Sequence, residues 1–228
     1  MHNTIVIMKK QIRDTFKNKT ILIQFVLFPV MTLIMENTIK IEGMPKNFFT
    51  KLFAVMYIGM APFVSTASVI SEEKEKNTLR VLMMADVKPR QYLTGVGIHI
   101  WTICMIGALV MSIGLPSTDR GFFLLIMGIG FFISVMAGAC VGVFSKNQMV
   151  ATSLTMPFMM ILAFAPMLSM FNETIKKYSA ALYTQLLRML FDQMSFEAIS
   201  QKDVVILCVN ALICITLFFL AYRKKGLD

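Results

Sequence analysis

Six long apolar stretches dominate the pattern of hydrophobic and polar positions along the chain. Each contains about 16 to 24 residues that are nearly free of charge, and about 20 helical residues cross the hydrocarbon core of a bilayer. We therefore predict an all-α polytopic membrane protein that forms a single domain over residues 1–228. The predicted spans are approximately 20–35, 52–71, 93–114, 121–144, 150–170 and 204–222.

The first 19 residues carry a different, amphipathic pattern. Apolar positions recur at spacings of three and four residues and basic positions recur every four residues on another face; these are Ile5, Met8, Ile12 and Phe16, and Lys9, Arg13 and Lys17. Such a pattern is typical of a helix that lies in the membrane interface. We predict an interface helix over 1–19, with a solvated leader of no fixed structure as the alternative.

The connection at 171–203 also has helical character. It contains four basic and four acidic residues, and Leu182, Leu186 and Leu190 recur every four positions. This spacing predicts one or two short amphipathic helices at the outer membrane surface, before the last span.

The composition supports a membrane protein with no catalytic domain of its own. Apolar residues make up 57% of the chain and charged residues 15%, compared with about 45–50% and about 25% in soluble domains. After six spans, 228 residues leave no room for a separate folded domain of about 100 residues. The net charge of +9 does not require nucleic acid as a partner, because Lys and Arg collect on the cytoplasmic flanks of spans.

The distribution of Lys and Arg predicts the orientation. Fourteen of the 22 basic residues lie on the side of the membrane that holds the amino terminus. This bias favours both termini in the cytoplasm of a protein in the cell (plasma) membrane.

Motifs for catalysis or metal binding are absent from the sequence. It contains no phosphate loop and no zinc-binding motif, and its four cysteines, Cys104, Cys140, Cys208 and Cys214, fall in apolar windows. We therefore expect neither enzyme activity nor a cofactor or metal in this chain. His99 lies in a span without a nearby Asp or Glu, which favours a hydrogen bond to Ser, Thr or a backbone carbonyl over a proton relay.

Small residues, prolines and methionines mark several of the spans. Ser134, Gly138 and Gly142 recur every four positions, which indicates close packing of two helices. Four prolines inside spans either kink their helices or are ordinary membrane residues; they are Pro29, Pro62, Pro157 and Pro166. The 21 methionines form either an adaptable substrate surface or lipid-facing apolar surface.

The most informative segment is the charged run that follows the second predicted span. It begins with Glu72, Glu73 and Glu75 and continues into Leu79, Val81 and Leu82. Acidic residues are favourable near a helix amino terminus, so we predict a short amphipathic helix with an acidic start. Pro89 then begins the next helix. The alternative is that these charges only stop translocation and remain solvated.

This segment resembles the membrane subunit of type-2 ABC exporters, the ABC-2 permease family. The family pattern at this place reads approximately E-x-E-x-x-T-L-x-x-L-L, and the matching positions are Glu73, Glu75, Thr78, Leu79 and Leu82. Asn77 stands where the family has glycine, and Met84-Ala85-Asp86-Val87 replaces a small or proline-bearing stretch. The six-span layout extends the resemblance over essentially the whole chain.

The resemblance implies a cytoplasmic coupling region at 72–92 that docks onto a separate ATPase. The residues to which it assigns this role are Glu72, Glu73, Glu75, Thr78, Leu79 and Leu82. It also implies two copies of an ABC ATPase subunit, which bind ATP and Mg²⁺, and a second membrane subunit that is either identical or a sibling chain.

We therefore expect the permease subunit of an ATP-driven exporter. The expected cargo is amphipathic or apolar, such as an antimicrobial peptide, a drug or a lipid-linked molecule. The alternative is a non-transporting membrane protein that serves as an immunity factor, a sensor or a scaffold. An intramembrane enzyme fits worst, because the spans lack paired Asp residues or a Ser–His arrangement.

Overall fold

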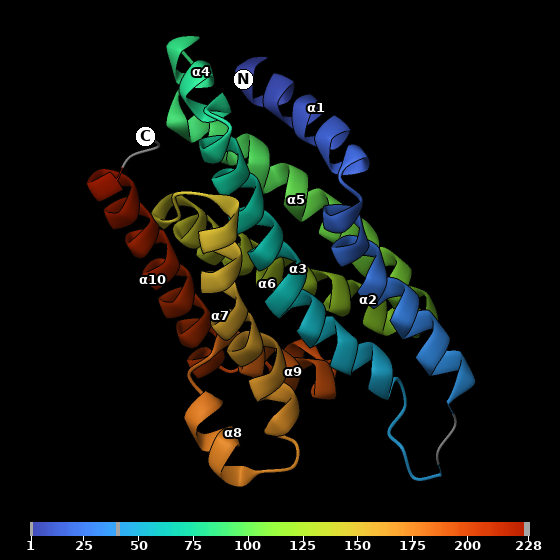
Figure 1. Cartoon of the computed structure of the whole chain (residues 1–228). Coiled ribbons are helices and arrows are strands. Elements are labelled where there is room, and N and C mark those ends of the chain that lie inside the picture. Colours follow the sequence, from blue (N-terminus) through green and yellow to red (C-terminus); the bar gives the residue numbers. More distant parts are fainter. Residues whose placement is uncertain (1, 40–41, 226–228) are drawn as a thin grey trace.

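A computed structural model describes residues 2–39 and 42–225 of the chain, and these residues form an all-helical bundle (Figure 1). Two short 3₁₀ turns, Ser112–Gly114 and Phe196–Ala198, join longer helices. The helices are α1 (His2–Lys17), α2 (Lys19–Thr38), α3 (Phe48–Glu75), α4 (Thr78–Met84), α5 (Pro89–Met111), α6 (Ser117–Phe144), α7 (Gln148–Leu168), α8 (Glu173–Ser179), α9 (Tyr183–Gln193) and α10 (Gln201–Lys225).

The six predicted spans are confirmed as helices. Within the described residues, six helices are long and apolar enough to cross a membrane: α2, α3, α5, α6, α7 and α10. The first predicted span, which is short for a crossing, gains length because its helix continues to Thr38. The bundle has two ends (Figure 1): the end that carries α1 and α4 is called the α4 end below, and the end that carries α8 and α9 is called the α8 end.

Helix α3 lies at the centre of the bundle and is its most enclosed span. It packs against α2, α5, α6, α7 and α9. The small-residue row on α6 permits the closest of these approaches, as the sequence indicated: a Cβ atom on Gly138 would lie 2.3 Å from the Phe63 carbonyl oxygen. Ser134 Oγ donates to the Ile58 carbonyl at 2.6 Å. These contacts fix α6 against α3.

Helix α1 has the amphipathic character predicted from the sequence. Ile5, Ile12 and Phe16 are exposed, as expected for an apolar face that rests in lipid. A second face, formed by Ile7, Gln11 and Thr15, is buried. This face packs on α5, which runs below α1 in Figure 1. The interface helix is therefore attached to the bundle.

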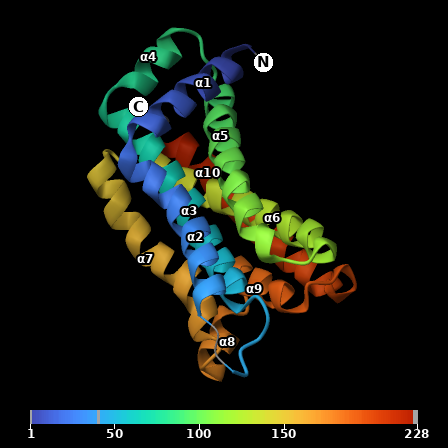
Figure 2. The same cartoon turned by 90° about the vertical axis from the view of Figure 1, so that its right-hand side faces the viewer.

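The segment before the last span contains two short helices, as predicted, and they differ in burial. Helix α8 is largely exposed, whereas α9 inserts among α3, α6 and α7 (Figure 2). Leu187 and Phe191 on α9 are fully buried, and Tyr183 shares a hydrogen bond of 2.7 Å with Ser134 of α6. The two helices predicted for this segment are therefore present, and the buried face of α9 includes the polar residues Thr184 and Gln185.

The expected position of the acidic run at the start of a short helix was wrong. Glu72, Glu73 and Glu75 form the last turn of the long helix α3 rather than the start of a short one. The macrodipole of a helix disfavours carboxylates at its carboxyl terminus, so these side chains need partners from elsewhere in the bundle.

Candidate coupling site

A sharp break separates α3 from α4 at the α4 end of the bundle. Asn77 adopts the left-handed conformation, with φ of 55°. Asn is one of the few residues besides glycine that tolerate this conformation, which explains how Asn77 can stand where the family resemblance has glycine. Pro89 then begins α5, as predicted. The short helix α4 is thereby held between two spans.

Helix α4 has one buried anchor and an exposed apolar surface. Leu79 is fully buried, and Leu82 is partly buried against the core. In contrast, Val81 is 63% exposed and Met84 is 82% exposed. Exposed apolar side chains that lie beyond the membrane spans are typical of a surface that binds a protein partner.

Glu73 connects the end of α3 to α1. Its Oε1 atom accepts a hydrogen bond of 2.8 Å from Gln11 Nε2 and forms a close ion pair with Lys10. Glu73 is 7% exposed, and its Oε2 atom has no hydrogen-bond partner among the described residues. A carboxylate buried in this way depends on its cation, so Lys10 and Glu73 hold α1 and α3 together.

Two further residues attach the last turn of α3 to α6 and α7. Glu75 Oε2 accepts a bond of 2.9 Å from the backbone nitrogen of Gln148, at the start of α7. A carboxylate is favourable at a helix amino terminus. Lys74 Nζ donates at 2.9 Å to the Val143 carbonyl near the end of α6, where a cation is favourable.

Glu72 has a local partner instead. Its carboxylate pairs with Lys76 one turn later, and this raises the pKa of the Lys76 amine above its ordinary value. Glu72, Glu73 and Thr78 also line a polar cavity of about 600 Å³ between α1 and α3. Four lysines and three carboxylates line this cavity, so it is densely charged: Lys10, Lys17, Lys19, Lys76, Asp14, Glu72 and Glu73.

His99 of α5 is enclosed beneath α1. Its Nε2 atom lies 2.9 Å from Thr15 Oγ1. This confirms the expectation of a helix-to-helix hydrogen bond, and it adds a polar contact between α1 and α5.

The six residues predicted for coupling thus lie near one another but have different surroundings. Glu73, Glu75 and Leu79 hold the site together, whereas the exposed surface is formed by other residues, chiefly Val81 and Met84. Sequence reasoning missed Lys10 and Gln11. The spacing of Ile7, Gln11 and Thr15, four residues apart, was the signal that α1 has a second buried face.

Six helices able to span a membrane, preceded by an amphipathic helix and joined by a short helix at the α4 end, define the class of polytopic all-α membrane proteins. Residues 2–220 match the family described as ABC-2 family transporter protein. Because the match covers nearly the whole chain, the protein belongs to the ABC-2 transporter family. No curated protein shows a significant match to the chain.

Proposed function

We propose that the protein is the permease subunit of an ATP-driven exporter and that α4 docks onto a separate ABC ATPase. The observation that carries the proposal is the exposed apolar surface of α4, held by its anchor Leu79 at the end of the most enclosed span. Closure of an ATPase pair on ATP would move α4, and α4 would move α3. ATP and Mg²⁺ are bound by the ATPase subunits and not by this chain.

The cargo we propose is amphipathic or apolar. A groove of about 1010 Å³ runs between α7 and α10 with α6 as its floor, and its lining is almost entirely apolar. Outside the lining of this groove, methionines are prominent among the exposed residues of α7, including Met149, Met156 and Met160. Flexible, polarisable side chains suit varied apolar ligands. The working unit contains two ATPase subunits and a second membrane subunit, identical or sibling.

Co-purification tests the docking of α4. We expect Val81→Asp combined with Met84→Asp to reduce the amount of ABC ATPase recovered with the tagged protein by about tenfold or more, because both side chains would be desolvated at the interface. The recovered ATPase is identified by mass spectrometry of membranes from the native cells. A measurement of monodispersity in detergent establishes that the variant folds.

The matched control changes two equally exposed residues at the α8 end. Phe171 is 78% exposed and Tyr178 is 82% exposed, so Phe171→Asp combined with Tyr178→Asp should leave ATPase recovery unchanged. If the wild-type chain recovers no ABC ATPase, the exporter proposal fails and the immunity, sensor or scaffold alternative gains support. An equal loss of recovered ATPase in both double variants would show that α4 is not the docking element.

Labelling of intact cells tests the proposed orientation, in which both termini and α4 face the cytoplasm of a plasma-membrane protein. A variant in which all four native cysteines are replaced by serine carries a single cysteine at Asn77 or, in a second variant, at Tyr178. Both positions are exposed. We expect a membrane-impermeant maleimide to label the Tyr178→Cys variant and not the Asn77→Cys variant. Labelling of the Asn77→Cys variant and not of the Tyr178→Cys variant would show that the protein has the opposite orientation.

A further inference from the structure

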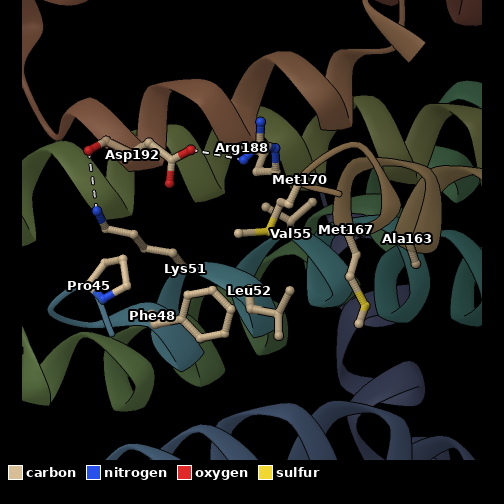
Figure 3. A pocket seen from close by; sticks show the side chains of 10 residues that line it. All are labelled: Pro45, Phe48, Lys51, Leu52, Val55, Ala163, Met167, Met170, Arg188 and Asp192. Atoms are coloured by element: carbon tan, nitrogen blue, oxygen red, sulfur yellow. Dashed lines mark hydrogen bonds and ion pairs between the residues drawn. The ribbon is translucent and has the colours of Figure 1, made fainter. Parts of the chain in front are cut away.

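A small enclosed cavity lies at the α8 end, between α3, α7 and α9 (Figure 3). Its volume is about 50 Å³. A cavity of about 10–15 Å³ is enough for one water molecule, so this space can hold a group of several heavy atoms. It lies well away from α4 and plays no part in the coupling site (Figure 1).

One wall of the cavity carries a hydrogen-bond donor that has no acceptor. Arg188 of α9 lines the cavity and pairs with Asp192 through Nη1 at 2.9 Å, but its Nε atom is buried and has no partner within the described part of the chain. A buried donor without an acceptor costs about 1–3 kcal/mol.

The charge on the cavity wall is positive. Lys51 of α3 points across the cavity toward α9 and donates at 3.3 Å to the backbone carbonyl of Asp192 (Figure 3). Lys51 and Arg188 therefore face a single lining carboxylate, that of Asp192. A water molecule would accept from the free donor but would not balance this charge. An oxyanion does both, because carboxylate and phosphate oxygens accept from guanidinium and ammonium groups.

The remaining walls are apolar. Phe48, Leu52 and Val55 of α3 lie below the charged groups in Figure 3, and Met167 of α7 and Met170, just after α7, lie beside them. Lys51 is also in the first turn of a spanning helix, which is the depth at which lipid-like molecules hold their polar heads. A ligand with an oxyanion head and an apolar body matches both parts of the wall.

We propose that this cavity binds the anionic head of an amphiphile whose apolar part rests on α3 and α7. Lys51 and Arg188 hold the oxyanion, and the Nε donor of Arg188 finds its acceptor there. The site requires neither ATP nor the ATPase, so its test is independent of the coupling proposal.

Competition binding tests the proposal on the full chain in nanodiscs of phosphatidylcholine. The tracer is a photoreactive fatty acid, and the competitors are dodecanoate, its uncharged analogue dodecanol, and acetate, which has the head without the tail. We expect dodecanoate to compete at a concentration about tenfold or more below that of dodecanol or acetate. Crosslinked peptides should map to α3, α7 or α9.

Two variants tie the binding to the cavity. Lys51→Met should raise the concentration of dodecanoate needed for competition about tenfold, and Arg188→Gln should do the same. The control Lys176→Met removes an exposed cation of α8 at the same end and should change nothing. Because Lys51 is only half-buried, its variant remains informative if the Arg188 variant does not fold.

Equal competition by dodecanoate and dodecanol would show that the charge is not recognised, and equal competition by dodecanoate and acetate would show that the tail is not recognised. Either result would overturn the proposal, as would unchanged dodecanoate binding in the Lys51→Met variant. Crosslinks confined to other helices would place the amphiphile elsewhere and would equally contradict it.

Discussion

Replacing Gly138 with alanine should separate α6 from α3 and destabilise the whole bundle. The new methyl group would lie 2.3 Å from the Phe63 carbonyl oxygen and 3.0 Å from Thr66 Cβ. Because the first of these is a backbone atom, no side-chain rotation relieves the contact. Overpacking of this kind costs about 1–3 kcal/mol, and we expect a clear fall in the thermal unfolding temperature of the protein in detergent.

Gly121→Ala on the same helix is the matched control. A Cβ atom at Gly121 meets nothing within 4 Å, and alanine is a better helix former than glycine by about 0.5–1 kcal/mol. The control variant should therefore unfold at the same temperature as the wild-type protein or slightly higher. A Gly138→Ala variant as stable as Gly121→Ala would contradict the close packing of α3 and α6.

The second large effect is expected from Lys10→Met, which leaves the Glu73 carboxylate buried without its cation. Breaking a fully buried ion pair costs about 3–5 kcal/mol. Lys10 is one-third exposed, so solvent reduces this, and we expect a loss of about 1–3 kcal/mol. The measurement is thermal unfolding in detergent, together with proteolysis of α1, which should become faster as α1 detaches.

The double variant Lys10→Met with Glu73→Gln separates charge pairing from simple packing. Glutamine keeps an acceptor for Gln11 but carries no charge, so the double variant should recover part of the stability that Lys10→Met loses. If the losses of stability caused by the two substitutions simply add, the ion pair contributes nothing to the attachment of α1 beyond packing.

The sequence was sufficient to predict the spans because each presents an uninterrupted apolar window. The window of α6 begins near Gly121, yet the helix begins at Ser117, since a polar first turn outside the hydrocarbon has no hydropathy signal. The window of α3 ends before Glu72, yet the helix continues to Glu75. Its charged last turn is stabilised by α1, α6 and α7, and such partners are not visible in a local pattern.

The sequence predicted which segment forms the candidate site, but not which of its residues are buried or bonded and which are exposed. The resemblance located Glu73 and Leu79, and the structure shows the first bound to α1 and the second buried as an anchor. Which residues of α4 remain exposed depends on how the short helix turns after Asn77. The assignment of these residues to ATPase coupling stays a prediction.

Polar residues at the α8 end were the hardest to interpret from sequence. The leucine spacing predicted a helix at α9, but it could not show that Gln185 would be buried or that Arg188 would line a cavity beside α3. A polar residue in an amphipathic pattern is ordinarily assigned to the solvent-facing side. Burial of this face became evident only from the tertiary packing.

The last turn of α3 has a mechanical consequence for the whole protein. Glu73, Lys74 and Glu75 bond to three different neighbours, so a rotation or slide of α3 would strain its contacts with α1, α6 and α7. We therefore expect a displacement that begins at α4 to be transmitted through α3 to all three of these helices. Helix α10 packs chiefly on α6, so we expect it to move only when α6 moves.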